Sequence, residues 1–156
     1  MEHKVGDLLS VEQGIILHQV NCQGKMNSGV AKAIREKWPV VFEEYLDHCH
    51  SGVVAEDVLG TAQVIKVGTD LWVANLFGQL NYGYDGRRYT SYDALDSGLA
   101  AVAAWMFENN FTSADAHHPL LGSDRGGACW GVVAALIKHR IGDRTTLWTL
   151  PFQERV

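Results

Sequence analysis

Short apolar runs along the chain predict the strands of a sheet. Four runs have the length of a buried strand, and they lie at residues 14–20, 61–67, 71–77 and 146–150. Continuous apolar runs of this length, bounded by turn residues, are typical of strands that are buried on both faces. The sequence Gly68-Thr69-Asp70 between two of the runs indicates a hairpin turn. A weaker pattern predicts a further strand within residues 111–121.

Other stretches repeat their apolar positions with the period of a helix. Residues 28–38 carry such positions at a spacing of four, and Pro39 then ends this helix and opens another, because proline is tolerated in a first helical turn. Residues 95–106 predict a second amphipathic helix. The preceding tetrapeptide, residues 90–93 (TSYD), resembles a capping box with Asp in place of Glu. Residues 130–141 predict the last helix.

Strands and helices alternate along the whole chain. The predicted order is strand, strand, helix, strand, strand, helix, strand, helix, strand. The run at 14–20 is the second strand of this order, and no bounds are predicted for the strand before it. This alternation is typical of an α/β fold whose helices cover both faces of a mostly parallel sheet. The 156 residues contain no repeat, low-complexity tract or linker, so we expect a single domain over residues 1–156.

The charge balance and the cysteines narrow the function classes. The formal net charge is -5, from 18 acidic and 13 basic residues, whereas proteins that grip long nucleic acids carry basic faces. We therefore expect no extended nucleic-acid binding. Three widely spaced cysteines argue against a disulfide scaffold. No signal-peptide pattern is present and no apolar stretch is long enough to span a membrane, so we expect a cytoplasmic monomer without membrane contact.

Two histidine-rich segments carry residue types that ligate metals. They are His48-Cys49-His50 and His117-His118. Adjacent residues rarely point at one ion, and neither CxxC nor HExxH spacing occurs. We therefore expect no metal and no cofactor.

Two glycine-containing loops carry the candidate chemistry. One spans residues 21–30 (NCQGKMNSGV) and the other residues 121–127 (LGSDRGG), and each follows a predicted strand and opens a helix. A helix start offers unpaired N–H groups and partial positive charge, and glycine lets the backbone approach an anion closely. Ligands of α/β sheets bind beyond the carboxyl ends of the strands. Two such loops side by side would hold two phosphates without a basic patch; the alternative is a pair of ordinary tight turns.

Several familiar nucleotide and hydrolase motifs are absent from the sequence. It contains no GxxxxGK[ST] loop, no GxGxxG and no GxSxG. Their absence argues against ordinary ATP or GTP hydrolysis, against a dinucleotide site and against a serine nucleophile elbow.

Three segments match the motifs of one protein family. Residues 5–9 (VGDLL) have the form of a G-D-I opening, residues 18–31 (HQVNCQGKMNSGVA) are close to N-C-x-G-x-M-G-x-G-[IV]-A, and residues 122–130 are a degraded G-[CS]-G-L-x-G loop. In these segments the chain resembles macro domains, the ADP-ribose-binding modules. The resemblance runs from residue 4 to 152 and implies a three-layer α/β/α sandwich with a mixed, mostly parallel sheet. The branch it most resembles contains the ADP-ribose 1''-phosphate phosphatases and the terminal ADP-ribose protein glycohydrolase.

The resemblance implies a role for each matching position. Asp7 would accept a hydrogen bond from the adenine amino group beside the Leu8 amide, and Phe152 would pack on the adenine. Asn21 would bond the distal ribose. The proximal ribose and the diphosphate would be surrounded by amides of Ser28, Gly29, Val30 and Ala31 and of Gly122, Ser123, Asp124, Arg125 and Gly126. The alternatives are a turn or a helix cap for Asp7, a turn for Asn21 and a core aromatic for Phe152.

Three positions depart from the family pattern. Asn27 stands where many relatives have glycine, although asparagine tolerates a positive φ better than most residues. Asp124 also replaces a glycine, and its carboxylate would repel a diphosphate unless Arg125 or protonation offsets the charge. The alternatives are that the Asp124 side chain turns away, that it acts in catalysis, or that it weakens binding. Gln79 occupies the place of the nucleophilic lysine of the glycohydrolase branch, and glutamine cannot form a Schiff base.

The phosphatase branch implies a proton-transfer group near the phosphate on the anomeric carbon. His18 matches a histidine of that branch and titrates in a suitable range; the alternative is a buried, hydrogen-bonded strand histidine. Asp85, in a loop that could close over the distal ribose, is a second candidate with an ordinary turn aspartate as its alternative, and Asp124 is a third. We expect a protein that binds ADP-ribose and hydrolyses ADP-ribose 1''-phosphate to ADP-ribose and phosphate. The alternatives are a non-catalytic ADP-ribose reader and a hydrolase that removes ADP-ribose from modified protein or nucleic acid.

Overall fold

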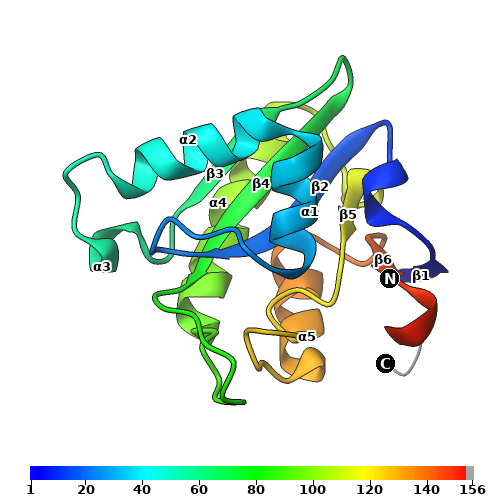
Figure 1. The fold of residues 1–156 in the computed structure, drawn as a ribbon. Coiled ribbons are helices and arrows are strands. Elements are labelled where there is room, and N and C mark those ends of the chain that lie inside the picture. The colour runs from blue at the N-terminus through cyan, green and yellow to red at the C-terminus, as the bar shows by residue number, and fades with distance from the viewer. Residues whose placement is uncertain (154–156) are drawn as a thin grey trace.

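The computed structural model describes residues 1–153 and consists of a six-stranded sheet between two layers of helices (Figure 1). The strands are β1 (Glu2–Val5), β2 (Gly14–Asn21), β3 (Ala62–Lys66), β4 (Leu71–Gln79), β5 (Ala116–His118) and β6 (Thr146–Thr149). Their order across the sheet is β1-β6-β5-β2-β4-β3. The hairpin partners β3 and β4 are antiparallel, and the other neighbours are parallel. The mixed sheet of the predicted α/β sandwich is confirmed.

Helices cover both faces of this sheet. They are α1 (Gly29–Lys37), α2 (Pro39–Cys49), α3 (Ala55–Val58), α4 (Tyr92–Glu108) and α5 (Trp130–Arg140), with 3-10 turns η1 (Leu8–Ser10), η2 (Ser113–Asp115) and η3 (Pro151–Gln153). In Figure 1 α1 and α2 lie over one face, and α4 and α5 lie over the other. Within residues 1–153, no helix combines the length and the apolar character needed to cross a membrane.

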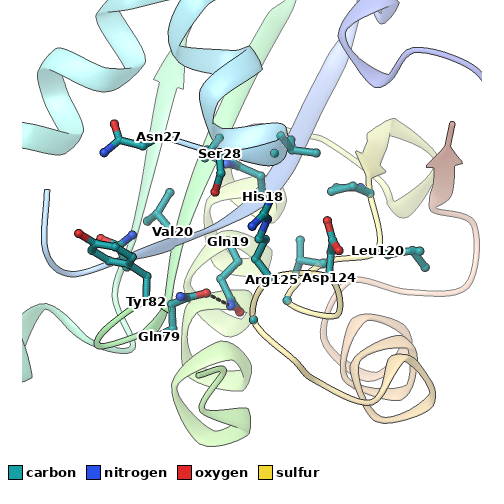
Figure 2. Close-up of a pocket in the computed structure, with 18 of the residues that line it drawn as sticks. His18, Gln19, Val20, Asn27, Ser28, Gln79, Tyr82, Leu120, Asp124 and Arg125 are labelled. Carbon is teal, nitrogen blue, oxygen red and sulfur yellow. Dashed lines mark hydrogen bonds between the residues drawn. The ribbon is translucent and has the colours of Figure 1, made fainter. Parts of the chain in front are cut away.

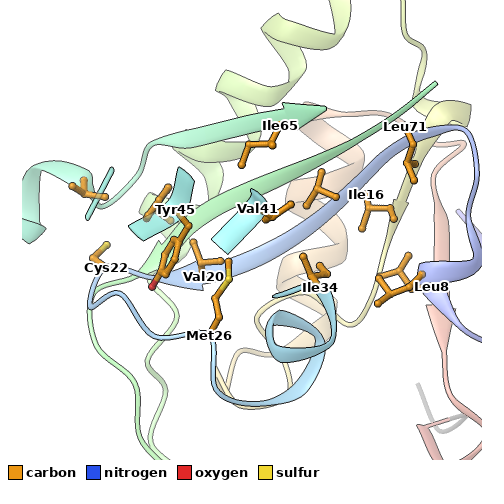
Figure 3. Close-up of a cluster of buried hydrophobic side chains, with 14 residues drawn as sticks. Leu8, Ile16, Val20, Cys22, Met26, Ile34, Val41, Tyr45, Ile65 and Leu71 are labelled. Carbon is orange, nitrogen blue, oxygen red and sulfur yellow. The ribbon is translucent and has the colours of Figure 1, made fainter. Parts of the chain in front are cut away.

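Alternate residues of the central strand β2 belong to different layers of the core. Ile16 and Val20 pack in the cluster that contains residues of α1 and α2 (Figure 3), whereas Ile15 and Leu17 pack with residues of α4 and α5. All four side chains are buried, and burying each one stabilises the fold by about 1.5–3 kcal/mol. Because both faces are covered, the strand needs apolar residues at nearly every position, which explains the continuous run in the sequence.

The predicted elements form, with differences at their ends. Strand β4 continues through Gly78 and Gln79, two residues beyond the predicted run at 71–77. Helix α4 is capped by Ser91, whose hydroxyl accepts a hydrogen bond from the Ala94 amide at 3.2 Å, so the capping box expected over residues 90–93 is wrong. The N-terminal strand β1 is exposed at every position, which is why no apolar run marks its bounds.

Candidate functional site

A cleft opens where β2, β4 and β5 end. The loops that border it come from three places in the sequence, at residues 21–29, 79–84 and 119–126. Figure 2 shows Ser28 on one side of the cleft, Arg125 on the other and His18 between them. The parallel strands end at the same edge of the sheet, and the two glycine-rich loops therefore face each other across one cleft.

Most of the predicted site residues border this cleft. Those that line it are His18, Asn21, Ser28, Gly29, Val30, Ala31, Gly122, Asp124, Arg125 and Gly126. The predicted residues outside the lining are Asp7, Leu8, Asp85, Ser123 and Phe152.

The N-terminus of α1 presents its amides to the cleft. Ser28 is the N-cap residue but its side chain makes no capping hydrogen bond, and the first amide of this region to be bonded within the helix is that of Lys32, to the Ser28 carbonyl at 3.2 Å. Gly29 adopts a φ of 59°, a left-handed conformation that glycine tolerates. The preceding N–H groups at this helix end are free to bind an anion, helped by the positive end of the helix dipole.

The first loop is held in place from below by Tyr45 of α2. The Tyr45 hydroxyl lies 2.8 Å from the Asn21 carbonyl and 2.7 Å from its Oδ1, and it accepts a hydrogen bond from the Lys25 amide at 3.0 Å. The Asn21 side chain also donates to the Lys25 carbonyl at 2.9 Å and accepts from the Gln23 amide at 2.9 Å. Asn21 therefore stabilises the turn as well as bordering the cleft, so the turn alternative describes part of its role.

The second loop is held by a polar chain that begins at Gln19. The Gln19 amide group donates to Gln79 Oε1 at 2.7 Å and to the Thr90 hydroxyl at 2.8 Å. The Thr90 hydroxyl donates in turn to the Gly122 carbonyl at 2.9 Å. The amides of Tyr89 and Thr90 both donate to the Gly126 carbonyl, at 2.9 and 3.0 Å. These bonds tie the loop to β2, to β4 and to the segment before α4.

Two glycines of the second loop are required by this close packing. A Cβ atom on Gly126 would lie 2.3 Å from the Thr90 hydroxyl and 2.5 Å from the Gly122 carbonyl oxygen. A Cβ on Gly122 would lie 2.8 Å from Gln19 Oε1, and the φ of Gly122 is 69°. Any side chain at either position would displace the loop from its supports.

Gln79, which stands in place of the lysine of the glycohydrolase branch, uses both its side-chain oxygen and its side-chain nitrogen in hydrogen bonds. Gln79 accepts the hydrogen bond from Gln19 (Figure 2), and its own amide group donates to the Asn81 carbonyl at 2.8 Å. The side chain is buried. Its role in the described structure is therefore to join β4 to the floor of the cleft.

His18 lies in the interior of the sheet at the bottom of the cleft. It is 1% exposed, and its Nε2 lies 2.5 Å from Oδ1 of Asn75 on β4. Burial lowers the pKa of His18 to about 4, an effect that the hydrogen bond to Asn75 only partly opposes. The ring is therefore neutral at physiological pH. Its other nitrogen, Nδ1, is buried and has no hydrogen-bond partner within residues 1–153.

The two candidate aspartates differ in their surroundings. Asp85 is exposed, accepts a hydrogen bond from the Tyr89 hydroxyl at 2.8 Å and forms an ion pair with Arg87 at 2.7 Å. These contacts lower the pKa of Asp85 to about 2, with the Tyr89 bond as the largest cause. Asp124 lines the cleft, and the guanidinium of the neighbouring Arg125 lies 4.8 Å from the ring centroid of Tyr84 in the loop after β4.

The residues expected to hold adenine lie beyond the ends of two neighbouring strands. Asp7 follows β1, and Phe152 lies in η3 after β6, the parallel partner of β1. Asp7 Oδ1 accepts a hydrogen bond from the Leu9 amide at 2.9 Å and caps η1, which is the helix-cap alternative. Phe152 is 80% exposed, so the alternative of a core aromatic is wrong.

Residues without a predicted role in the site support the cleft. Tyr45, Gln19, Thr90 and Asn75 were not among the predicted site residues, yet each holds a loop or a side chain of the cleft. Two of these residues, Gln19 and Asn75, could have been found in the sequence, because each is a polar residue inside an apolar strand. Such residues need hydrogen-bond partners when buried and therefore mark a network.

Comparison with solved structures places this fold in a known class. A protein of unknown function from Bacteroides thetaiotaomicron is 26% identical with a TM-score of 0.81, and each chain is covered to 96%. A macrodomain protein from Streptomyces coelicolor is 25% identical with a TM-score of 0.77, covering 95% of this chain and 97% of that one. Thermosipho africanus DarTG, solved in complex with ADP-ribose, is 16% identical with a TM-score of 0.76, covering 99% of this chain and 43% of that one.

The fold and the loop-bordered cleft define a three-layer α/β/α domain of the macrodomain class. On these likenesses the chain has the fold of a macrodomain, the fold that its loop motifs predicted. No profile of a known protein family matches the sequence. Among curated proteins, the ADP-ribose 1''-phosphate phosphatase of Neosartorya fischeri is 40% identical over 47 residues. That match spans 30% of this chain and 24% of the relative.

Proposed function

We propose that this chain binds ADP-ribose in the cleft and hydrolyses ADP-ribose 1''-phosphate to ADP-ribose and phosphate. The observation that carries the proposal is the pair of facing loops, with the free amides at the start of α1 opposite the glycine-rich loop at 121–127. A diphosphate fits such a cradle, because backbone amides and a helix dipole bind phosphate without needing a basic surface. The names of the partial relatives support the phosphatase reaction.

The proposed orientation runs along the edge of the sheet. The adenine would lie against Phe152, with its amino group donating to the Asp7 carboxylate and the Leu8 amide beside it. The loops would hold the proximal ribose and the diphosphate, including the amide of Ser123, whose side chain turns back to the Leu121 carbonyl at 3.3 Å. Asn21 would bond the distal ribose at the opposite end. Arg125 is then placed to offset the charge of Asp124 beside the diphosphate.

In the proposed reaction a water molecule attacks phosphorus and the bond between phosphorus and the anomeric oxygen breaks. The attacking water gives up a proton to a base, and the anomeric oxygen receives one as it leaves. His18 is the favoured base, because it borders the cleft, is neutral, and has an Nδ1 atom without a hydrogen-bond partner within residues 1–153. Asp124 is the second candidate. Asp85 would act only after its loop moved, because it lies outside the cleft lining in an ion pair with Arg87.

A second function, ADP-ribose reading without turnover, is favoured by the deep burial of His18. A base that is 1% exposed reaches a water molecule only if the bound ligand admits one beside it. Removal of ADP-ribose from modified protein or nucleic acid is a third outcome, and here it would have to proceed without a nucleophilic lysine at position 79.

Two measurements test these functions. Calorimetric titration with free ADP-ribose should show binding, weakened in Asn21→Ala; the absence of binding by the folded wild type would overturn all three functions. Phosphate release from ADP-ribose 1''-phosphate should fall about 100-fold in His18→Ala. Asp124→Asn tests the second base and Asp85→Asn the third; because Asp85 lies outside the cleft lining, Asp85→Asn should change the rate less than the other two variants.

The pattern of results separates the candidates. Binding without phosphate release selects the reader. Loss of label from ADP-ribosylated protein or nucleic acid, with no release from the phosphate ester, selects the third function. Equal release by wild type and His18→Ala would remove His18 from the reaction.

A further inference from the structure

A row of three polar side chains crosses the sheet beneath α2. His18 of β2, Asn75 of β4 and Gln63 of β3 are register partners on neighbouring strands. His18 Nε2 lies 2.5 Å from Asn75 Oδ1, Asn75 Nδ2 lies 3.2 Å from Gln63 Oε1, and Gln63 Nε2 lies 3.0 Å from the carbonyl of Glu44 in α2. The row therefore begins at the floor of the cleft and ends at the backbone of a surface helix.

The end of the row dictates the direction of every hydrogen bond in it. A backbone carbonyl can only accept, so the Glu44 carbonyl requires the NH₂ group of Gln63 to face it. The Gln63 oxygen must then face Asn75 and accept from the Asn75 NH₂ group. This leaves the Asn75 oxygen facing His18, and an oxygen can only accept, so the proton of the neutral imidazole lies on Nε2.

The consequence for the cleft is that His18 presents a lone pair at Nδ1. This nitrogen is buried and has no partner within residues 1–153, and an unpaired buried polar atom is costly unless a ligand or water supplies the missing bond. The ring borders the cleft. An acceptor at this position suits an O–H donor, either the attacking water or a hydroxyl of the bound sugar.

We infer that Asn75 and Gln63 are positioning residues that fix the tautomer of His18, so that this histidine acts toward the ligand as a hydrogen-bond acceptor and base through Nδ1. The role of His18 as a base rests on the proposed phosphatase function. The position of the proton on the imidazole ring does not depend on that function. Neither residue is itself part of the cleft lining. Their effect on the reaction passes through the orientation and the proton position of the imidazole.

Position 63 offers a matched pair of variants, because Gln63 is only half buried. In Gln63→Glu the carboxylate still accepts from the Asn75 NH₂ group, so the Nε2–H tautomer should persist. In Gln63→Lys the ammonium can only donate, so Asn75 must turn its oxygen toward Lys and its NH₂ group toward His18. The imidazole should then carry its proton on Nδ1, and the acceptor in the cleft is lost.

Nitrogen NMR of the His18 ring at neutral pH measures the tautomer directly. We expect a protonated Nε2 and an unprotonated Nδ1 in the wild type and in Gln63→Glu, and the reverse in Gln63→Lys. A wild-type ring protonated at Nδ1, or a Gln63→Lys ring with an unchanged tautomer, would overturn the inference. Circular dichroism confirms that each variant is folded. If Gln63→Lys does not fold, Asn75→Asp is the second variant: a carboxylate at position 75 also accepts from Nε2–H, so the wild-type tautomer should persist, and a ring protonated at Nδ1 alone would overturn the inference.

Kinetics separate this inference from the proposed function. Phosphate release should lose at least about tenfold in kcat in Gln63→Lys with little change in KM, and Gln63→Glu should retain it. A Gln63→Lys variant with the reversed tautomer and an unchanged kcat would refute the base role of Nδ1. If the wild type releases no phosphate, the proposed function fails, while the tautomer measurement still decides whether Asn75 and Gln63 position His18.

Discussion

Replacing Gly126 by alanine tests how the second loop is built. The added Cβ would lie 2.3 Å from the Thr90 hydroxyl, 2.5 Å from the Gly122 carbonyl oxygen and 3.0 Å from Gln19 Nε2. The hydroxyl belongs to the buried Thr90 and the amide group to the half-buried Gln19, which already bond each other, and the carbonyl belongs to the backbone. The methyl group therefore cannot be accommodated by a rotamer change and must displace the loop.

The size of the effect follows from these contacts. Overpacking of this kind costs about 1–3 kcal/mol. In a domain of this size, that cost lowers the melting temperature by roughly 2–12 °C. Displacement of the loop also moves Gly122 and Arg125 away from the opposite loop, so the affinity for ADP-ribose should fall by at least about tenfold, which corresponds to roughly 1.4 kcal/mol.

Thermal unfolding and calorimetric titration measure the two parts separately. Gly131→Ala is the matched control, because the same methyl group there meets only Cys129 Sγ at 3.9 Å and lies on the exposed surface of α5. Alanine inside a helix is favoured over glycine by about 1 kcal/mol, so the control should be as stable as the wild type or more so and should bind ADP-ribose normally. A Gly126→Ala protein with wild-type stability and affinity would refute the packing of the loop described above.

Three further changes test other parts of the structure. Tyr45→Phe removes the hydroxyl that joins Asn21 to the Lys25 amide, and urea denaturation should show a loss of about 1–3 kcal/mol; an unchanged midpoint would mean that the first loop does not depend on it. Burial lowers the pKa values of His18 and His118 to about 4, so the unfolded chain binds more protons than the folded one between pH 6.5 and pH 4. The free energy of unfolding should therefore decrease as the pH falls through this window, by up to roughly 3 kcal/mol per histidine, and a flat profile by circular dichroism would contradict the burial of both rings. Arg140→Ala breaks an exposed bidentate ion pair at 2.8 and 2.9 Å and should leave the midpoint of chemical denaturation nearly unchanged, because exposed ion pairs contribute little to stability; a clear loss of stability would give that pair an unexpected structural role.

The sequence was sufficient to predict the strands that are buried on both faces. Strand β2 is covered on both faces, and its apolar run identified it directly. Strand β1 is exposed at every residue and pairs only with β6 among the described strands, so its residues carry no hydrophobic pattern. The cap of α4 was misplaced by one residue because Thr90 and Ser91 have equivalent capping chemistry, and the burial of Thr90 against the second loop decides between them.

The candidate site was predictable only in its ligand-facing part. Glycine and the order of strand, loop and helix were visible at 21–30 and 121–127, and the family resemblance supplied the roles. The supports come from positions up to 103 residues away along the chain, as Gln19 and Gly122 illustrate. No local pattern connects two such residues, because their contact depends on the register of β2 against β4 and on the path of the segment before α4.

Two consecutive residues of β2, His18 and Gln19, hold the site together from opposite faces of the sheet. His18 faces α2 and is held through Asn75, whereas Gln19 faces the α4 side and holds the second loop through Thr90. Successive residues of a strand must alternate in this way. A shift of β2 by one residue would exchange the two side chains and break both networks while also moving Ile16 and Leu17 between the two cores. The register that buries the apolar residues of β2 is thus the same register that places the imidazole and the second loop at the cleft, so core packing and site geometry are fixed by one set of contacts.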